Sequence, residues 1–149
     1  MELIKRVVFI LTIALASQSA HAFCWKEAAQ RYQIDAKLLY AIGMTESSMR
    51  PNIVSKTEDI GLMGINRYWL TKLAEFGINE QALFDPCTNV MVGAWILSDN
   101  FARKGVTWDA VGAYNAACTR LKGAACTQQR MKYANRVYEY YLLAPPSLD

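Results

Sequence analysis

One helix-forming segment limits the folds that are open to this chain. Asp85 is a good N-cap, and Pro86 follows it at the first helical position, where the missing N–H of proline costs least. The predicted helix runs to about Lys104, and residues 90–97 in its middle are apolar on nearly every side. A helix of this kind has to be surrounded by other elements. We therefore predict a central buried helix inside one core.

The other signals along the chain are also mostly helical. Asp35 caps a second helix, and Pro51 ends it because proline disfavours helical geometry in the residue before it. Residues 52–64 are polar and interrupted by glycine, which predicts a loop with at most a fragment of strand. This second helix covers residues 36–49, and the remaining predicted helices cover residues 24–32, 66–76, 108–117 and 127–143. The sequence predicts a mainly α fold, an α+β class with little or no strand, in one compact domain over residues 23–143, followed by a frayed tail over residues 144–149.

The first 22 residues have the pattern of a secretory signal peptide. Lys5 and Arg6 form a basic start, an apolar stretch follows, and the small residues Ala20 and Ala22 flank the position before a cleavage site. The apolar stretch is about ten residues long, whereas a helix that crosses a bilayer needs roughly 20. We expect cleavage after Ala22, which leaves 127 residues, enough for one substantial core, and export to the periplasm.

Charge and composition exclude several kinds of function. Loss of Glu2, Lys5 and Arg6 with the signal lowers the formal net charge from +3 to +2, and the sequence contains no basic run. Nucleic acid is therefore not the expected partner, although a mild positive charge suits an anionic wall polymer. The one histidine, His21, lies in the signal. Histidine-based catalysis and histidine-bound zinc are thus excluded, no metal or cofactor is expected, and carboxylates, tyrosines and lysines remain for chemistry.

Four cysteines remain after cleavage, which in a small exported chain indicates two disulfides. Three pairings are possible. We favour Cys118 with Cys126, because the short segment between them contains the turn-forming Gly123, and this choice leaves Cys24 to join Cys87. The alternative is that some of the cysteines stay free and buried.

Glu46 interrupts the apolar face of the helix predicted over residues 36–49. Leu39, Ile42 and Glu46 are spaced i, i+3 and i+7, so their side chains share one face. Burial there would raise the pKa of the carboxyl, and a glutamic acid that keeps its proton near neutral pH can protonate a leaving group. The alternative is a surface ion pair with Arg50, one turn further on, which would contribute only about 0.3–0.5 kcal/mol.

Two further stretches allow either a structural or a functional interpretation. The sequence DIGLMGIN over residues 59–66 has two glycines beside bulky apolar residues, typical of a backbone held close to a ligand or of a packed turn. The sequence GAYNAA over residues 112–117 places a tyrosine next to an asparagine on a helix of small residues. Taken singly, each of these polar residues fits ordinary packing as well as a site.

Four short motifs, in this order and spacing, resemble the soluble lytic transglycosylase family, whose domain has the goose-type lysozyme fold. TESS at 45–48 is similar to the catalytic E-S motif, GLMGIN to G-L-M-Q-I-N, AYNA to A-Y-N-A-G, and YANRV to Y-V-x-x-V. The FCW start, DIGLM and LFDPCTNVMVGAW resemble a smaller group of exported transglycosylases that accompany type III secretion, conjugation and type IV pilus machines. This resemblance also supports a bridge between Cys24 and Cys87.

The resemblance implies roles for individual residues around a substrate cleft. Glu46 takes the place of the single catalytic acid, and Ser47 that of a serine that supports the acid or touches substrate. The backbone of Gly61, Leu62 and Met63 would form the lip of the cleft. The residues expected to surround the glutamate and the bound sugars are Tyr114, Asn115 and Tyr133.

Two positions depart from the family pattern. Gly64 stands where the family usually has glutamine, so one hydrogen bond from a side chain to sugar is in doubt. Ala117 replaces the glycine that ends A-Y-N-A-G, which bears on the loop before Cys118. Neither change removes the acid.

The implied reaction is cleavage of the bond between N-acetylmuramic acid and N-acetylglucosamine in peptidoglycan, with a 1,6-anhydro product. One carboxyl serves this reaction as acid and then as base, whereas hydrolysis normally uses two. Asp59 keeps a hydrolytic alternative open, because it either orients a water in the cleft or only caps the loop before Gly61.

A third hypothesis is a non-catalytic module that binds the wall or an assembly, for which Gly64 and Ala117 would be the evidence. The retained Glu46 argues against it, since a buried carboxyl without a task costs stability. The expected partners are glycan strands of peptidoglycan, together with components of a secretion, conjugation or pilus complex, and the chain is expected to be a monomer.

Overall fold

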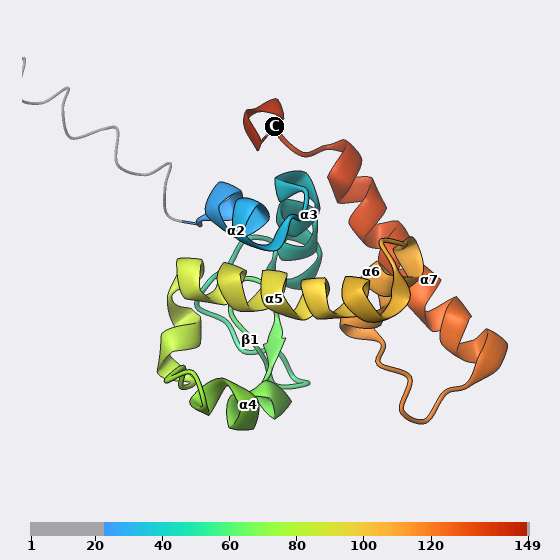
Figure 1. Ribbon diagram of the computed structural model, residues 1–149, viewed down its shortest axis with the longest axis horizontal. Helices are drawn as coiled ribbons and strands as arrows, with labels where there is room; N and C mark the ends of the chain where they lie inside the picture. Colours follow the sequence, from blue (N-terminus) through green and yellow to red (C-terminus); the bar gives the residue numbers. More distant parts are fainter. Residues whose placement is uncertain (1–22, 149) are drawn as a thin grey trace, which may run out of the picture.

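The computed structural model describes residues 23–148; the expected signal peptide, residues 1–22, and Asp149 lie outside the described residues. Figure 1 shows a mainly helical body whose middle is crossed by the long helix α5. The elements are α2 (Trp25–Tyr32), α3 (Ala36–Ser47), β1 (Asp59–Ile60), β2 (Ile65–Asn66), the 3-10 helix η1 (Arg67–Trp69), α4 (Leu70–Ala74), η2 (Gln81–Phe84), α5 (Pro86–Lys104), α6 (Trp108–Asn115), α7 (Gly123–Leu142) and η3 (Pro146–Leu148). The prediction of a mainly α single domain with little strand is confirmed.

Helix α5 is the centre of the core, as predicted. An Oδ2 atom of Asp85 accepts the backbone N–H of Thr88 at 2.8 Å, and Gly105 follows the last helical residue. Val90 and Leu97 have no solvent exposure, and α5 packs against α2, α3, α6, η2 and β2. Met91 and Trp95 are only partly covered, so the helix is buried on most sides rather than on all.

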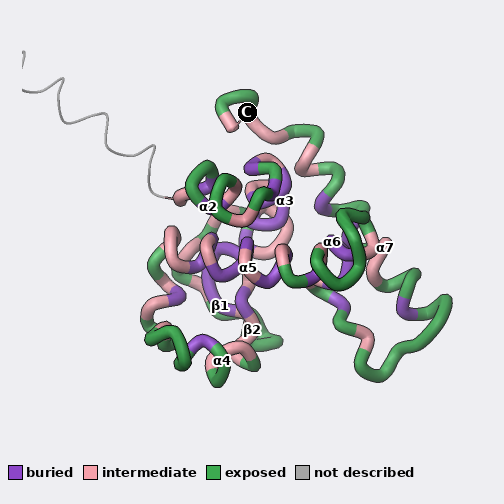
Figure 2. Tube along the Cα trace, viewed as in Figure 1, coloured by how far each residue is buried: buried purple, intermediate pink, exposed green. Residues whose placement is uncertain are grey.

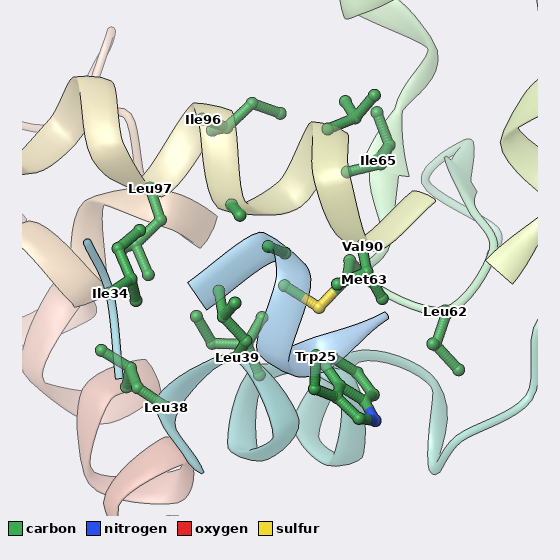
Figure 3. Packing of buried hydrophobic residues seen from close by; sticks show 14 of the residues in the cluster. Trp25, Ile34, Leu38, Leu39, Leu62, Met63, Ile65, Val90, Ile96 and Leu97 are labelled. Carbon is green, nitrogen blue, oxygen red and sulfur yellow. The ribbon is translucent and has the colours of Figure 1, made fainter. Parts of the chain in front are cut away.

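The core joins three parts of the chain that are far apart in the sequence. Figure 3 shows side chains of α2 and α3, of the turn between β1 and β2, and of α5 packed together. Complete burial of one such aliphatic side chain contributes about 1.5–3 kcal/mol. The labelled members of this cluster are Trp25, Ile34, Leu38, Leu39, Leu62, Met63, Ile65, Val90, Ile96 and Leu97.

Helix α7 packs against both α3 and α6, along one side of the molecule (Figure 1). Its approach to α6 depends on Gly112, because a Cβ atom at that position would lie 2.5 Å from the backbone oxygen of Arg130. Only glycine leaves room for helix backbones this close. The same approach brings Tyr133, one turn after Arg130, over the C-terminal half of α3, where its hydroxyl meets Glu46.

A short antiparallel hairpin follows α3. Asp59 pairs with Asn66, and Ile60 pairs with Ile65. Gly61 and Gly64 begin and end the turn between the strands with φ values of +72° and +60°, in the left-handed region that favours glycine. The strand fragment predicted for residues 52–64 is therefore half of this hairpin.

A buried asparagine of α5 fixes the turn of the hairpin. Asn89 has no solvent exposure, and its Oδ1 atom accepts the backbone N–H of Met63 at 2.7 Å. Its Nδ2 group donates to the carbonyl oxygens of Ile60 at 2.9 Å and Leu83 at 2.8 Å. A Cβ atom on Gly61 would lie 2.4 Å from this Nδ2 atom, so the first glycine of the turn is required by the contact.

Several predicted helix ends are wrong by a few residues. Helix α3 ends at Ser47 rather than Met49, because Ser48 and Met49 both have positive φ values. The helix predicted over residues 66–76 is divided into η1 and α4, since the side chain of Asn66 accepts the N–H of Tyr68 and starts a tighter 3-10 turn. Helix α6 ends at Asn115 and not at residue 117.

The C-terminal part of the chain is more ordered than predicted. Helix α7 begins at Gly123, which puts Cys126 inside its first turns, rather than at Thr127. The tail contains η3 over Pro146–Leu148, and Leu148 packs against the core, so the described part of the tail is not frayed. The η2 turn at Gln81–Phe84 was not predicted at all.

Two disulfides link segments of the described chain, one near its N-terminal end and one between α6 and α7. Cys24 is bonded to Cys87 at the start of α5, and Cys118 is bonded to Cys126. Figure 2 shows that the segment between α6 and α7, which the second disulfide closes, is largely exposed. None of the helices in the described part of the chain combines the length and the apolar character that crossing a membrane requires.

Replacement of Asn89 by alanine should lower the free energy of unfolding by about 3 kcal/mol, because it leaves three buried backbone groups without partners. Urea unfolding measures this loss. Asn135, exposed on α7, provides the control, and its alanine variant should stay within about 0.5 kcal/mol of the parent. Equal stability of the two variants would contradict the role given to Asn89.

Candidate active site

A cleft of about 430 Å³ lies between the hairpin and the α5–α6–α7 side of the molecule. Glu46 from α3 and Asp59 from β1 lie in its wall, and Tyr114 and Asn115 from α6 face it from another element. The cleft thus brings together four residues that the sequence analysis selected. The other residues that line it are Gly64, Asn66, Tyr68, Trp69, Ile96, Asn100, Arg103, Lys104, Ala113, Ala117, Thr119 and Arg130.

Glu46 continues the buried face of α3, as its spacing predicts. Leu39 and Ile42 have no solvent exposure, and Glu46 one turn later is half-buried in the wall of the cleft. The surface ion pair with Arg50 is not formed: the Nε group of Arg50 donates to the carbonyl oxygen of Ser47 at 2.8 Å. Glu46 has a buried partner instead.

Two other elements hold the carboxyl group of Glu46. The hydroxyl of Tyr133 on α7 donates to Oε1 at 2.6 Å. The Oε2 atom lies against Gly64 in the hairpin turn, where a Cβ atom would approach it to 2.6 Å. The absence of a side chain at position 64, a departure from the family pattern, therefore gives the carboxyl room to lie against the turn.

Burial raises the pKa of Glu46 to about 7. The hydrogen bond from Tyr133 and the charge of Arg136 lower the pKa, whereas the negative charge of Asp59 raises it. Desolvation is the largest of these effects, because it disfavours the charged form of the acid. Near neutral pH a large fraction of Glu46 therefore keeps its proton, which a general acid requires.

Asp59 is both bound in a turn and exposed to the cleft. Its Oδ2 atom accepts hydrogen bonds from the hydroxyls of Ser55, at 2.7 Å, and Thr57. Its Oδ1 atom accepts one from the Nδ2 group of Asn66 at 2.8 Å. Both features that the sequence left as alternatives are thus present: the carboxylate orders the turn before Gly61, and it also lines the cleft beside Glu46.

The two tyrosines bring helices α6 and α7 to the acid. Tyr114 donates from its hydroxyl to the carbonyl oxygen of Met63 at 2.8 Å, which joins α6 to the hairpin turn. Burial raises the pKa of both Tyr114 and Tyr133 well above the usual value, and the charge of Glu46 raises it further. Both hydroxyls are therefore protonated donors throughout the physiological range.

Five of the expected site residues lie outside the lining of the cleft, and one of them, Tyr133, still contacts the acid. Ser47 is buried, and its hydroxyl donates to the carbonyl oxygen of Gly43 at 3.1 Å, so it stabilises the end of α3 directly below the acid. Leu62 and Met63 point into the core with no exposure, and Gly61 packs on Asn89. Of the turn, it is Gly64 that reaches the cleft.

The sequence analysis did not identify the basic and aromatic part of the cleft. Tyr68 and Trp69 come from η1, Arg103 and Lys104 from the last turn of α5, and Arg130 from α7. Nothing in their local sequence distinguishes these residues from ordinary surface residues. Asn89 did have a signal, because it is a polar residue directly before the apolar run of residues 90–97. Among the described residues, no group of three or more histidine, cysteine and acidic side chains is arranged to hold a metal ion.

Curated proteins of similar sequence include proteins from Salmonella, Shigella and Escherichia. The chain is 41% identical over 139 residues to the Invasion protein IagB of Salmonella typhimurium, an alignment that covers 89% of this chain and 84% of that protein. It is 36% identical over 143 residues to Protein IpgF of Shigella flexneri, covering 93% and 91% of the two chains. A protein of Escherichia coli O157:H7 called "Peptidoglycan-binding-like protein" is 34% identical over 149 residues. This alignment covers 90% of this chain and 86% of that protein.

A solved structure has the same fold, and a family match shows to which protein family the chain belongs. An inactive mutant of the lytic transglycosylase Slt from Pseudomonas aeruginosa superposes with a TM-score of 0.67 at 22% identity, over 85% of this chain and 24% of that one. Slt therefore shares the fold of this domain. The transglycosylase SLT domain family matches residues 23–137, which include every residue discussed above for the acid and its support. The chain therefore belongs to the transglycosylase SLT domain family, whose enzymes are the lytic transglycosylases of peptidoglycan.

Proposed function

We propose that this chain cleaves the β-1,4 bond between N-acetylmuramic acid and N-acetylglucosamine and leaves a 1,6-anhydro-muramyl end. The observation that carries the proposal is the position of Glu46, an acid with a pKa of about 7 in the wall of a cleft of about 430 Å³. The membership of the chain in the transglycosylase SLT domain family agrees with this reaction.

The first step uses Glu46 as the acid. Tyr133 donates to Oε1, so the proton of the neutral carboxyl is carried by Oε2, the atom that lies next to Gly64. This proton passes to the oxygen of the glycosidic bond as the bond to the anomeric carbon breaks. The carboxylate that remains keeps the hydrogen bond from Tyr133, which stabilises its new charge.

The second step uses the same group as the base. The carboxylate of Glu46 takes the proton of the muramyl C6 hydroxyl, and the C6 oxygen forms a bond to the anomeric carbon. The ring closes without water, and Glu46 recovers its proton for the next cycle. A group with a pKa near the working pH suits both transfers.

The second candidate function is hydrolysis, and the position of Asp59 favours it. Asp59 lines the same cleft as Glu46, and the hydrogen bonds from Ser55, Thr57 and Asn66 orient its carboxyl group. A second carboxylate in this position is what a lysozyme-type enzyme uses to place a water or to stabilise positive charge on the sugar. The products of the two reactions differ by one water.

We also propose that the chain works in the periplasm and opens the wall locally for a secretion, conjugation or pilus assembly. Two disulfides are typical of proteins in an oxidising compartment. Residues 1–22 have the pattern of an export signal. The Salmonella relative is called an invasion protein, which agrees with a role beside such an assembly.

Purified peptidoglycan treated with the protein should release muropeptides with anhydro ends, which mass spectrometry detects. The Glu46→Gln variant should lose activity by about 10²–10⁴-fold, because it has no proton to transfer. Glu139→Gln, at an exposed position on α7, is the matched control and should keep full activity. Reducing ends, heavier by one water, would instead establish the hydrolase.

The rate should fall as the pH rises through about 7, because the acid form of Glu46 is lost. Replacement of Tyr133 by phenylalanine removes a hydrogen bond that lowers the pKa of Glu46, so this fall should move to higher pH. A pH profile of kcat/KM measures the shift. Tyr138→Phe, on the exposed side of α7, should leave the profile unchanged. A shift to lower pH for the Tyr133 variant would refute the electrostatic assignment.

The raised pKa of Glu46 also has a consequence for stability. Its pKa is about 7 in the folded chain against an ordinary value of 4.5, so the folded chain binds the proton more tightly than the unfolded chain. Stability is therefore lost as the pH rises from about 4.5 through about 7. The free energy of unfolding of Glu46→Gln should exceed that of the parent by about 1–3 kcal/mol more at pH ~8 than at pH ~4, by urea unfolding. A difference that does not change with pH would rule out a buried acid.

A further inference from the structure

The cleft that holds Glu46 also has a basic region. Arg103 and Lys104 come from the last turn of α5, and Arg130 comes from α7. We call these three residues the basic cluster. Figure 1 shows that the C-terminal end of α5 lies beside α6, and α7 packs against α6. The proposed reaction gives this region no task, because its acid and base are both Glu46.

The charges of the basic cluster are not fully balanced. Arg103 forms an ion pair with Asp99 at 2.6 Å, and Asp109 is shared by Arg130, at 3.1 Å, and Lys104. Three cations therefore face two carboxylates. Asp99 and Asp109 themselves do not line the cleft, so the positive groups, and not their partners, are presented to a ligand.

The three cations differ in how firmly they are held. Arg130 is the most covered, and its Nε group also donates to the carbonyl oxygen of Ala116 at 3.0 Å. Lys104 Nζ lies 3.9 Å from Asp109, beyond hydrogen-bond distance, so its donors remain available to another acceptor. Arg103 also donates to Oδ1 of Asn100 at 3.1 Å, and Asn100 is buried. This neutral, buried partner orients the guanidinium without cancelling its charge.

A cluster of guanidinium and ammonium groups in a sugar-binding cleft favours a substrate that carries an anionic group. The two sugars of the glycan carry no charge on their rings, but the muramyl residue bears a short peptide with free carboxylates. Arginine binds carboxylates through two parallel N–H donors, and lysine adds a mobile charge beside it. The cleft thus offers an acid for the glycosidic bond and cations for a charged branch of the same strand.

We propose that the basic cluster is a subsite for the carboxylates of the peptide attached to muramic acid, so the enzyme prefers peptide-bearing glycan to glycan stripped of its peptides. This inference rests on the proposed function of the cleft. The competing explanation is structural, since cations in the last turn of a helix also stabilise its dipole. Only the substrate role depends on whether the peptide is present.

The first experiment compares kcat/KM on peptide-bearing glycan and on the same glycan after removal of its peptides by an amidase. The variant Arg103→Gln with Lys104→Gln should lose on the order of tenfold on the peptide-bearing substrate, mainly through KM, as expected for charge-assisted hydrogen bonds at a partly exposed site. Its loss on stripped glycan should be several-fold smaller, because that substrate has no peptide carboxylates. The matched control is Lys26→Gln with Lys132→Gln, which removes two positive charges from exposed helical positions outside the cleft.

The outcomes separate this inference from the proposed function. Equal losses on both substrates, or no loss on either, would overturn the subsite and leave the enzyme assignment intact. A parent chain that cleaves neither substrate would refute the proposed function itself. The same loss in the control variant would also overturn the subsite, because a general effect of net charge would then explain the result.

A binding measurement tests the subsite without catalysis. The Glu46→Gln protein is titrated calorimetrically with a soluble disaccharide–tetrapeptide and with the same compound after its carboxyls have been converted to amides. The free acid should bind about tenfold more tightly than the amide, and the Arg103→Gln, Lys104→Gln changes should abolish this difference. Equal affinity for acid and amide would overturn the inference.

Discussion

The hydrogen bond from the hydroxyl of Tyr133 to Glu46 joins two helices that are far apart in the sequence, and it opposes the effect of burial on the pKa of the acid. It forms only because α7 crosses α6 at Gly112 closely enough to bring Tyr133 over α3. Burial pushes the pKa of the carboxyl up, and this bond pulls it down, which leaves the pKa at about 7. A more exposed glutamate would have a lower pKa, and a buried one without the tyrosine would have a higher pKa.

Besides α3 and α7, the hairpin turn also contacts the acid, and the conformation of that turn depends on α5. Asn89 uses its side-chain amide to bind Ile60, Met63 and Leu83, so this buried polar group of the central helix is hydrogen-bonded through both its oxygen and its nitrogen. The turn can then end at Gly64 directly beneath the carboxyl of Glu46. The two glycines serve different neighbours, since Gly61 makes room for Asn89 and Gly64 makes room for the acid.

The acidic and the basic residues of the cleft lie on different elements of the fold. Glu46 and Asp59 come from α3 and the hairpin, whereas the basic cluster comes from the ends of α5 and from α7. Opposite charges that were allowed to pair across the cleft would neutralise each other. Here the basic residues pair with Asp99 and Asp109, and Asp59 is held by hydroxyl and amide donors. In the described part of the chain, no ion pair joins the acidic residues of the cleft to its basic residues.

The sequence by itself determined the mainly helical fold, the buried helix α5 and the acidic residue on an apolar face, because these follow from local spacing, caps and turn residues such as Asp85 and Pro86. The motif resemblance added Tyr114, Asn115 and Tyr133, of which the structure brings Tyr133 into contact with the acid. Helix ends were less certain, because side-chain caps such as that of Asn66 decide between α and 3-10 turns. Only the tertiary structure decided that Glu46 binds Tyr133 rather than Arg50, that Ser47 and Met63 turn away from the cleft, and that three separate cations line it. Those facts depend on how helices cross, and a crossing is fixed by contacts between residues that are distant in the sequence.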